Sequence, residues 1–156
     1  MRILIIGCGN LLAADDAVGI HVIRALRSRR LPENVTLIEA GLPGLNLIHL
    51  WQPDDQVIIV DAVRSNSPPG RIHRFQIEEL PPPNPSPGSV HGLGLLETLH
   101  LARLTEMLPA LILVMGIEIA NETPNLTTLS PLVEAAVEPL ADLIAAEAAR
   151  ISKSGF

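Results

Sequence analysis

Aromatic side chains are scarce in this chain of 156 residues, which contains two Phe, one Trp and no Tyr. Its core must therefore be built from Leu, Ile, Val and Ala, and the scarcity argues against a platform that stacks the bases of single-stranded nucleic acid. Basic residues are also outnumbered, with 11 Lys and Arg against 17 Asp and Glu and a formal net charge of −6. We therefore expect neither a nucleic-acid partner nor binding to an anionic membrane.

Cysteine and long apolar runs are equally rare. A single cysteine, Cys8, excludes an internal disulfide and a multi-cysteine metal site, and suits a reducing compartment. No apolar run reaches the roughly 18 residues of a membrane span, and the first predicted strand starts at residue 2 with no signal-peptide pattern before it. We expect a soluble, cytoplasmic monomer with one domain over residues 1–156.

Apolar strands alternate with helical patterns along the chain, which is typical of an α/β sandwich with a mainly parallel sheet. The patterns predict strands that include residues 3–6, 35–39, 56–62 and 110–116. An alternating run at 71–77 predicts an edge strand, for which we expect antiparallel pairing. Helices are predicted over 17–32, 45–51, 93–107 and 130–151, the last with an apolar stripe of Leu132, Val133, Ala136, Val137, Leu140, Leu143 and Ile144.

The first 22 residues organise the chain. An apolar strand ends in a glycine turn, Gly7-Cys8-Gly9, and two acids, Asp15 and Asp16, follow just before a helical pattern. Ligands of open α/β sheets bind at the carboxyl ends of the strands, so these carboxylates are site candidates. The alternative is that one of them caps the helix, which would not account for both.

Three polar side chains lie at predicted strand ends or beside them: Asp16 after the first strand, Asp61 at the end of the third, and His91 after the proline-rich segment 80–88. Since adjacent parallel strands end at one crevice, Asp16 and Asp61 can converge there and His91 can reach the same edge. Two carboxylates and an imidazole suit a divalent transition metal with positions left open. Singly, Asp61 could be a turn residue and His91 a cap or a solvated histidine.

Other reactive side chains have weaker support. No histidine is positioned by sequence to activate Cys8. We therefore expect the Cys8 side chain to fill space at the strand end. His73 shows no partner spacing, and Glu118 and Glu122 either line the crevice or are solvated.

A nucleotide site is a competing interpretation of the glycine turn. The dinucleotide fingerprint requires a third glycine where Leu12 stands, and Asp15 and Asp16 would repel a pyrophosphate. The match is therefore partial and its electrostatics are unfavourable.

Residues 7–19, GCGNLLAADDAVG, resemble the opening motif of the hydrogenase maturation endopeptidases. The resemblance continues through VIIVDAV around Asp61, SVHGLGL around His91, LILVMGIE, and LSPLVEAAVEPL near the end, and so covers nearly the whole chain. The departures from the family pattern leave Asp16, Asp61 and His91 unchanged: Ala17 and Gly92 stand in place of a glycine and a glutamine, Leu42 in place of a threonine, and Ile119 in place of a proline.

The resemblance implies a three-layer α/β/α sandwich around a five-stranded, mostly parallel sheet. It also implies an endopeptidase, of the aspartyl or metal-dependent type, that removes the C-terminal extension of a [NiFe] hydrogenase large-subunit precursor. The family's metal-contacting positions correspond to Asp16, Asp61 and His91, which would contact nickel carried by the precursor, so that the resting enzyme need hold no metal. Asn10 and Asp15 would orient this set. A non-catalytic metal-sensing chaperone of the large subunit is the alternative, motivated by the departures at Leu42 and Ile119.

Overall fold

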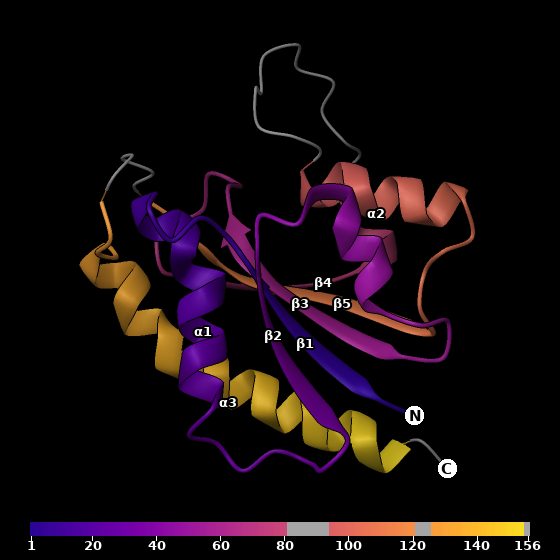
Figure 1. Ribbon diagram of the computed structural model, residues 1–156. Helices are drawn as coiled ribbons and strands as arrows, with labels where there is room; N and C mark the ends of the chain where they lie inside the picture. The colour runs from indigo at the N-terminus through magenta and orange to yellow at the C-terminus, as the bar shows by residue number, and fades with distance from the viewer. Residues whose placement is uncertain (81–93, 121–125, 155–156) are drawn as a thin grey trace.

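A five-stranded sheet forms the centre of the protein (Figure 1). The computed structural model describes residues 1–80, 94–120 and 126–154. The strands are β1 (Ile3–Cys8), β2 (Val35–Gly41), β3 (Gln56–Val63), β4 (Ile72–Gln76) and β5 (Leu111–Glu118), in the order β2-β1-β3-β5-β4. Pairing is parallel except between β4 and β5, which confirms the predicted fold class and its antiparallel edge strand.

Successive side chains of a strand point to opposite faces of the sheet, and each face of this sheet has its own buried hydrophobic cluster. Ile3, Ile5, Ile58 and Val60 pack with α1 (Val18–Leu26) and α3 (Pro131–Ser154) on one face. The alternate residues of the same strands pack on the other face against α2 (Leu95–Leu104) and the 3₁₀ helix η2 (Gly44–Leu50). Helices therefore cover both sides of the sheet (Figure 1).

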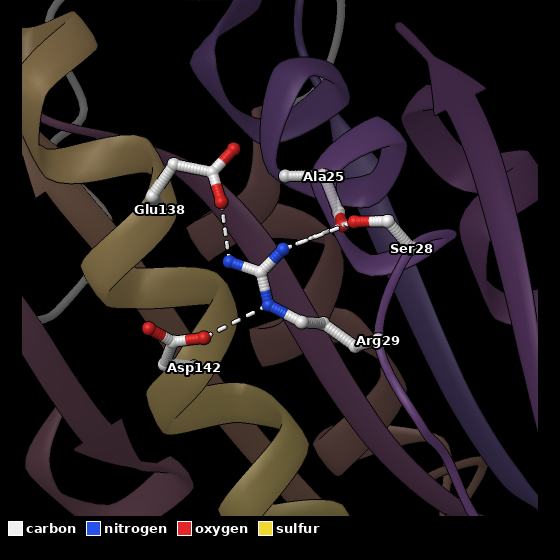
Figure 2. Close-up of polar contacts among 5 residues, drawn as sticks. All are labelled: Ala25, Ser28, Arg29, Glu138 and Asp142. Atoms are coloured by element: carbon white, nitrogen blue, oxygen red, sulfur yellow. Dashed lines mark hydrogen bonds and ion pairs between the residues drawn. The ribbon is translucent and has the colours of Figure 1, made fainter.

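Polar contacts fix α1 to α3 at the rim of the first face (Figure 2). Arg29 follows α1 and donates hydrogen bonds to Asp142, at 2.8 Å, and to Glu138 of α3. The same guanidinium donates to the Ala25 carbonyl and the Ser28 hydroxyl. Because Arg29 is bound to both segments, it sets how the end of α1 lies on α3.

Several predicted helices have different bounds or surfaces in the structure. The first ends at Leu26 instead of residue 32. It ends early because the Ser28 hydroxyl donates to the Ala25 carbonyl and because Pro32 disfavours helical geometry in the residue before it. The segment predicted as a helix over 45–51 is the 3₁₀ helix η2. On α3, Leu132 and Leu143 are exposed, and the buried stripe continues instead through Ala141, Ala148 and Ile151.

Within the described residues, the helices are too short or too polar to cross a membrane. Most of the proline-rich segment 80–88 lies outside the described part of the chain. The single domain over 1–156 and the monomeric state remain predictions.

Candidate active site

The carboxyl ends of the neighbouring parallel strands β1 and β3 lie at one edge of the sheet. From β1 the sheet continues to β2 on one side and to β3 on the other, so the two strands flank the switch point where open α/β sheets bind ligands. The register of the pair ends at Gly7 and Val60, and β3 runs three residues further. Asp61 is thus the first β3 residue beyond the edge of β1.

A tight loop brings Asp16 to the same edge. Gly9 has φ +138°, and a Cβ at this position would lie 2.0 Å from the Asp16 carbonyl oxygen, so only glycine fits. One carboxylate oxygen of Asp16, Oδ2, accepts the Asn10 N–H at 2.8 Å. The Asn10 side chain closes the turn by accepting the Leu12 N–H, so the predicted orienting role of Asn10 is carried out by its backbone.

A second close backbone contact holds α1 against the ends of β1 and β3. A Cβ on Gly19 would lie 2.3 Å from the Val60 carbonyl oxygen and 2.4 Å from that of Cys8. Gly19 therefore allows the close helix–strand contact that the dinucleotide fingerprint assigns to its third glycine. Its place inside the helical pattern hid this function from sequence reasoning.

Asp61 is partly buried and carries an unusual carboxyl group. Burial raises its pKa to about 7, and the negative charge of Asp16 acts in the same direction. The N–H of Ala62, which donates to Asp61 Oδ1 at 2.8 Å, and the positive charge of Arg64 oppose this shift. The charges of Asp16 and Arg64 therefore act on Asp61 in opposite directions.

Cys8 lies in the core below these acids. It is 5% exposed, and burial, followed by the charges of Asp61 and Asp16, raises the pKa of its thiol well above the usual range. A thiol held in its neutral form is a poor nucleophile, which agrees with the predicted packing role.

Asp15 does not cap α1, and neither does Asp16, because the residue before α1 makes no side-chain cap. Asp15 is fully buried and accepts hydrogen bonds from the Ala120 N–H at 3.0 Å and from the N–H and hydroxyl of Ser130 at 2.6 and 2.8 Å. Ser130 immediately precedes α3. The carboxylate thus fastens the segment after β5 and the start of α3 to the loop that carries Asp16.

An Asp15→Asn variant should test this function by thermal unfolding. Its amide NH₂ would face a backbone N–H where a carboxylate oxygen accepted one, and we expect a loss of about 2 kcal/mol, or roughly 4–8 °C in Tm. Asp142→Asn removes an equal charge from the exposed ion pair with Arg29 and is the matched control, with an expected loss below about 1 kcal/mol. Equal shifts in the two variants would contradict the anchoring function.

Arg64 is a site residue that the sequence reasoning missed. Its Nη2 lies 2.6 Å from Asp16 Oδ1, although 48 positions separate the two residues. Arg64 also borders a cavity of about 480 Å³ between the loop after β3 and the end of β5, together with Asn66, Glu118 and Ala120. Arg64 thus borders this cavity and also pairs with Asp16.

Glu118 is buried rather than solvated, contrary to one of the two expectations for it. It accepts hydrogen bonds from the Ser65 N–H and hydroxyl at 2.8 and 2.9 Å and from the Ser67 N–H at 3.1 Å. His73, for which the sequence shows no partner spacing, places Nε2 3.1 Å from the same carboxylate. Burial would raise the pKa of Glu118, but these hydrogen bonds and the charge of His73 outweigh it and hold the pKa below its usual value. Glu122 lies outside the described residues.

His91 also lies outside the described residues, so the structure describes two of the three predicted site residues, Asp16 and Asp61. Within residues 1–80, 94–120 and 126–154 there is no group of three His, Cys, Asp or Glu side chains that could hold a metal ion. The metal site of Asp16, Asp61 and His91 remains a prediction.

Known proteins resemble the chain over nearly all of its length. Residues 20–147 match the family described as hydrogenase maturation protease. The Hydrogenase 2 maturation protease of Escherichia coli is 34% identical over 148 residues, covering 94% of this chain and 90% of that protein. The solved structure of the hydrogenase maturating endopeptidase HybD from E. coli has a TM-score of 0.80 and 33% identity, covering 99% of this chain and 94% of its own. For the [NiFe] hydrogenase maturation protease HycI of Thermococcus kodakarensis the TM-score is 0.70 and the identity 26%, over 92% of this chain and 90% of that one.

Proposed function

Because the chain belongs to the hydrogenase maturation protease family, we propose that it removes the C-terminal extension from a [NiFe] hydrogenase large-subunit precursor once nickel has been inserted. It is an endopeptidase by its family, and the similar protein of T. kodakarensis is a [NiFe] hydrogenase maturation protease. The observation that supports the proposal is that Asp61 lies at the end of β3 beside the switch point, where the charge of Asp16 acts on it. We therefore favour an endopeptidase over the two alternatives, a metal-sensing chaperone and a nucleotide-binding domain.

In this proposal Asp16, Asp61 and His91 contact the nickel that the precursor carries. Carboxylate and imidazole groups are suitable ligands for a divalent transition metal, and an incomplete set leaves positions for ligands of the precursor itself. The bound metal then identifies a correctly loaded substrate and places the scissile peptide next to a positive charge that polarises its carbonyl group. The cavity bordered by Arg64 and Glu118 offers room for the chain beside the metal.

Mass spectrometry of the precursor tests the proposal directly. The nickel-loaded and nickel-free forms, taken from the organism that makes this protein, are each incubated with it. We expect loss of a C-terminal peptide from the loaded form only. Cleavage of both forms would contradict recognition of nickel, and an intact precursor in a stable complex would indicate the chaperone instead.

Variants connect the reaction to the residues. Asp16→Asn should abolish processing of the loaded precursor, because it weakens a direct metal contact. Asp142→Asn changes the net charge equally on the exposed surface of α3 and should process normally.

A further inference from the structure

Both carboxylate oxygens of Asp16 are engaged in the structure. Oδ1 accepts the Nη2–H of Arg64 at 2.6 Å, and Oδ2 accepts the Asn10 N–H at 2.8 Å. The Asp16 side chain is 18% exposed and that of Arg64 46% exposed, so the ion pair is partly accessible to solvent. A cation that binds Asp16 Oδ1 must therefore compete with the guanidinium.

The loop that carries Arg64 is fixed at its base. Buried Glu118 binds the backbone N–H groups of Ser65 and Ser67, and Asn66 between them takes the left-handed conformation at φ 61°. The backbone next to Arg64 therefore has little freedom, whereas the long side chain extends from it to the exposed ion pair. Displacement of the Arg64 side chain from Asp16 would free Oδ1 for another cation.

We propose that Arg64 is an internal counter-ion that keeps free divalent cations off the acidic pair Asp16 and Asp61, and that nickel carried by the precursor displaces it. The inference rests on the proposed contact of Asp16 with nickel. It assigns Arg64 as a specificity-determining residue that makes the site respond to metal presented by a protein rather than to metal in solution.

Charge and multivalency explain how one arginine can discriminate between free Ni²⁺ and nickel carried by the precursor. A guanidinium and a divalent cation repel each other strongly at contact distance, so they cannot share Asp16 Oδ1. A free ion must displace Arg64 with only the few ligands that the site offers. Nickel held by a docked precursor comes with the remaining contacts of that protein, which makes the displacement effectively intramolecular and raises the local concentration of the metal.

Isothermal titration of Ni²⁺ into the full-length, precursor-free protein tests the inference. We expect Arg64→Gln to bind Ni²⁺ about tenfold more tightly than the wild type, because the competing cation is gone. Arg150→Gln is the matched control, since Arg150 is also an exposed arginine (60%) paired with a carboxylate, but lies near the end of α3. Its affinity should agree with that of the wild type within about twofold.

Three outcomes overturn the proposal. The first is an unchanged Ni²⁺ affinity in Arg64→Gln and in a second variant, Arg64→Met, both checked for folding by circular dichroism. The second is an equal gain in Arg150→Gln, which would indicate a general charge effect. The third is a gain that persists in the double variant Arg64→Gln/Asp16→Asn, which would place the metal elsewhere.

A processing assay separates this inference from the proposed function. Added free Ni²⁺ should slow cleavage by Arg64→Gln at concentrations about tenfold lower than those needed for the wild type. If the wild type cleaves no precursor at all, the proposed function fails, whereas the Ni²⁺ titration still decides whether Arg64 protects the carboxylates.

Discussion

An Asp61→Asn variant is expected to be more stable than the wild type at pH 8 and yet to process the nickel-loaded precursor at least about 100-fold more slowly. The two effects have opposite signs because the same carboxylate is unfavourable for the fold and necessary for the proposed metal contact. Asparagine keeps the size of the side chain and an oxygen that can accept the Ala62 N–H. The variant therefore changes charge with little change in shape.

The stability effect follows from the raised pKa of Asp61. This pKa is about 7 in the folded protein against an ordinary value of 3.8, so the folded state holds a proton that the unfolded chain releases. The contribution of the neutral Asp61 carboxyl group to the free energy of unfolding is fully present below about pH 4. It decreases as the pH rises to about 7 and does not change further above that. The side chain is only partly buried, so we expect a gain of about 2 kcal/mol for Asp61→Asn at pH 8, or roughly 4–8 °C in Tm.

Thermal unfolding at pH 4 and pH 8, with a chelator present, measures this effect. The two proteins should differ little at pH 4 and clearly at pH 8, because only the wild type carries the unfavourable charge there. A constant difference at both values would refute the pKa argument. The loss of processing follows because even partners that merely orient a metal ligand change affinity or activity by about 10–100-fold. Normal turnover would remove Asp61 from the site.

The sheet and its acidic pair could be predicted because their signals are local. Continuous apolar runs identify strands buried on both faces, as in β3 and β5, and parallel strands necessarily end at a common edge. The prediction that Asp16 and Asp61 lie at this edge rests on these two facts. The end of α1 was predicted too late because apolar periodicity does not detect the polar contacts of Ser28 and Arg29 that terminate the helix.

The other polar contacts of the site are long-range and leave no periodic trace. Asp15 binds Ser130 across 115 positions, and Glu118 binds Ser65 across 53. The sequence left open whether Asp15 orients the site or caps a helix and whether Glu118 lines the crevice or is solvated, because single carboxylates near strand ends have no distinguishing spacing. The sequence indicated burial only for Glu118, because this residue ends an apolar strand. Arg64, in an exposed loop, had no such signal.

A Glu118→Ala variant should be the least stable of the variants proposed for this protein. It removes an acceptor that is 2% exposed and leaves the N–H groups of Ser65 and Ser67 without their partner. Loss of one side of a buried, charge-assisted network typically costs about 3–5 kcal/mol, which corresponds to roughly 10 °C in Tm. Glu138→Ala is the matched control, because the Glu138 side chain is 65% exposed and pairs with Arg29, and its loss should cost less than about 1 kcal/mol.

The pH dependence of this difference identifies its cause. Burial acts to raise the pKa of Glu118, but its hydrogen bonds and the charge of His73 lower it overall, so the folded protein favours the ionised form. The carboxylate contributes stability above the ordinary pKa of about 4.5, and this contribution is lost as the pH falls through the lower value in the folded state. The difference between wild type and Glu118→Ala should therefore shrink on acidification. A difference that does not change with pH would mean that the glutamate stabilises the loop of Arg64 by packing alone, and Glu118→Gln would then be as stable as the wild type.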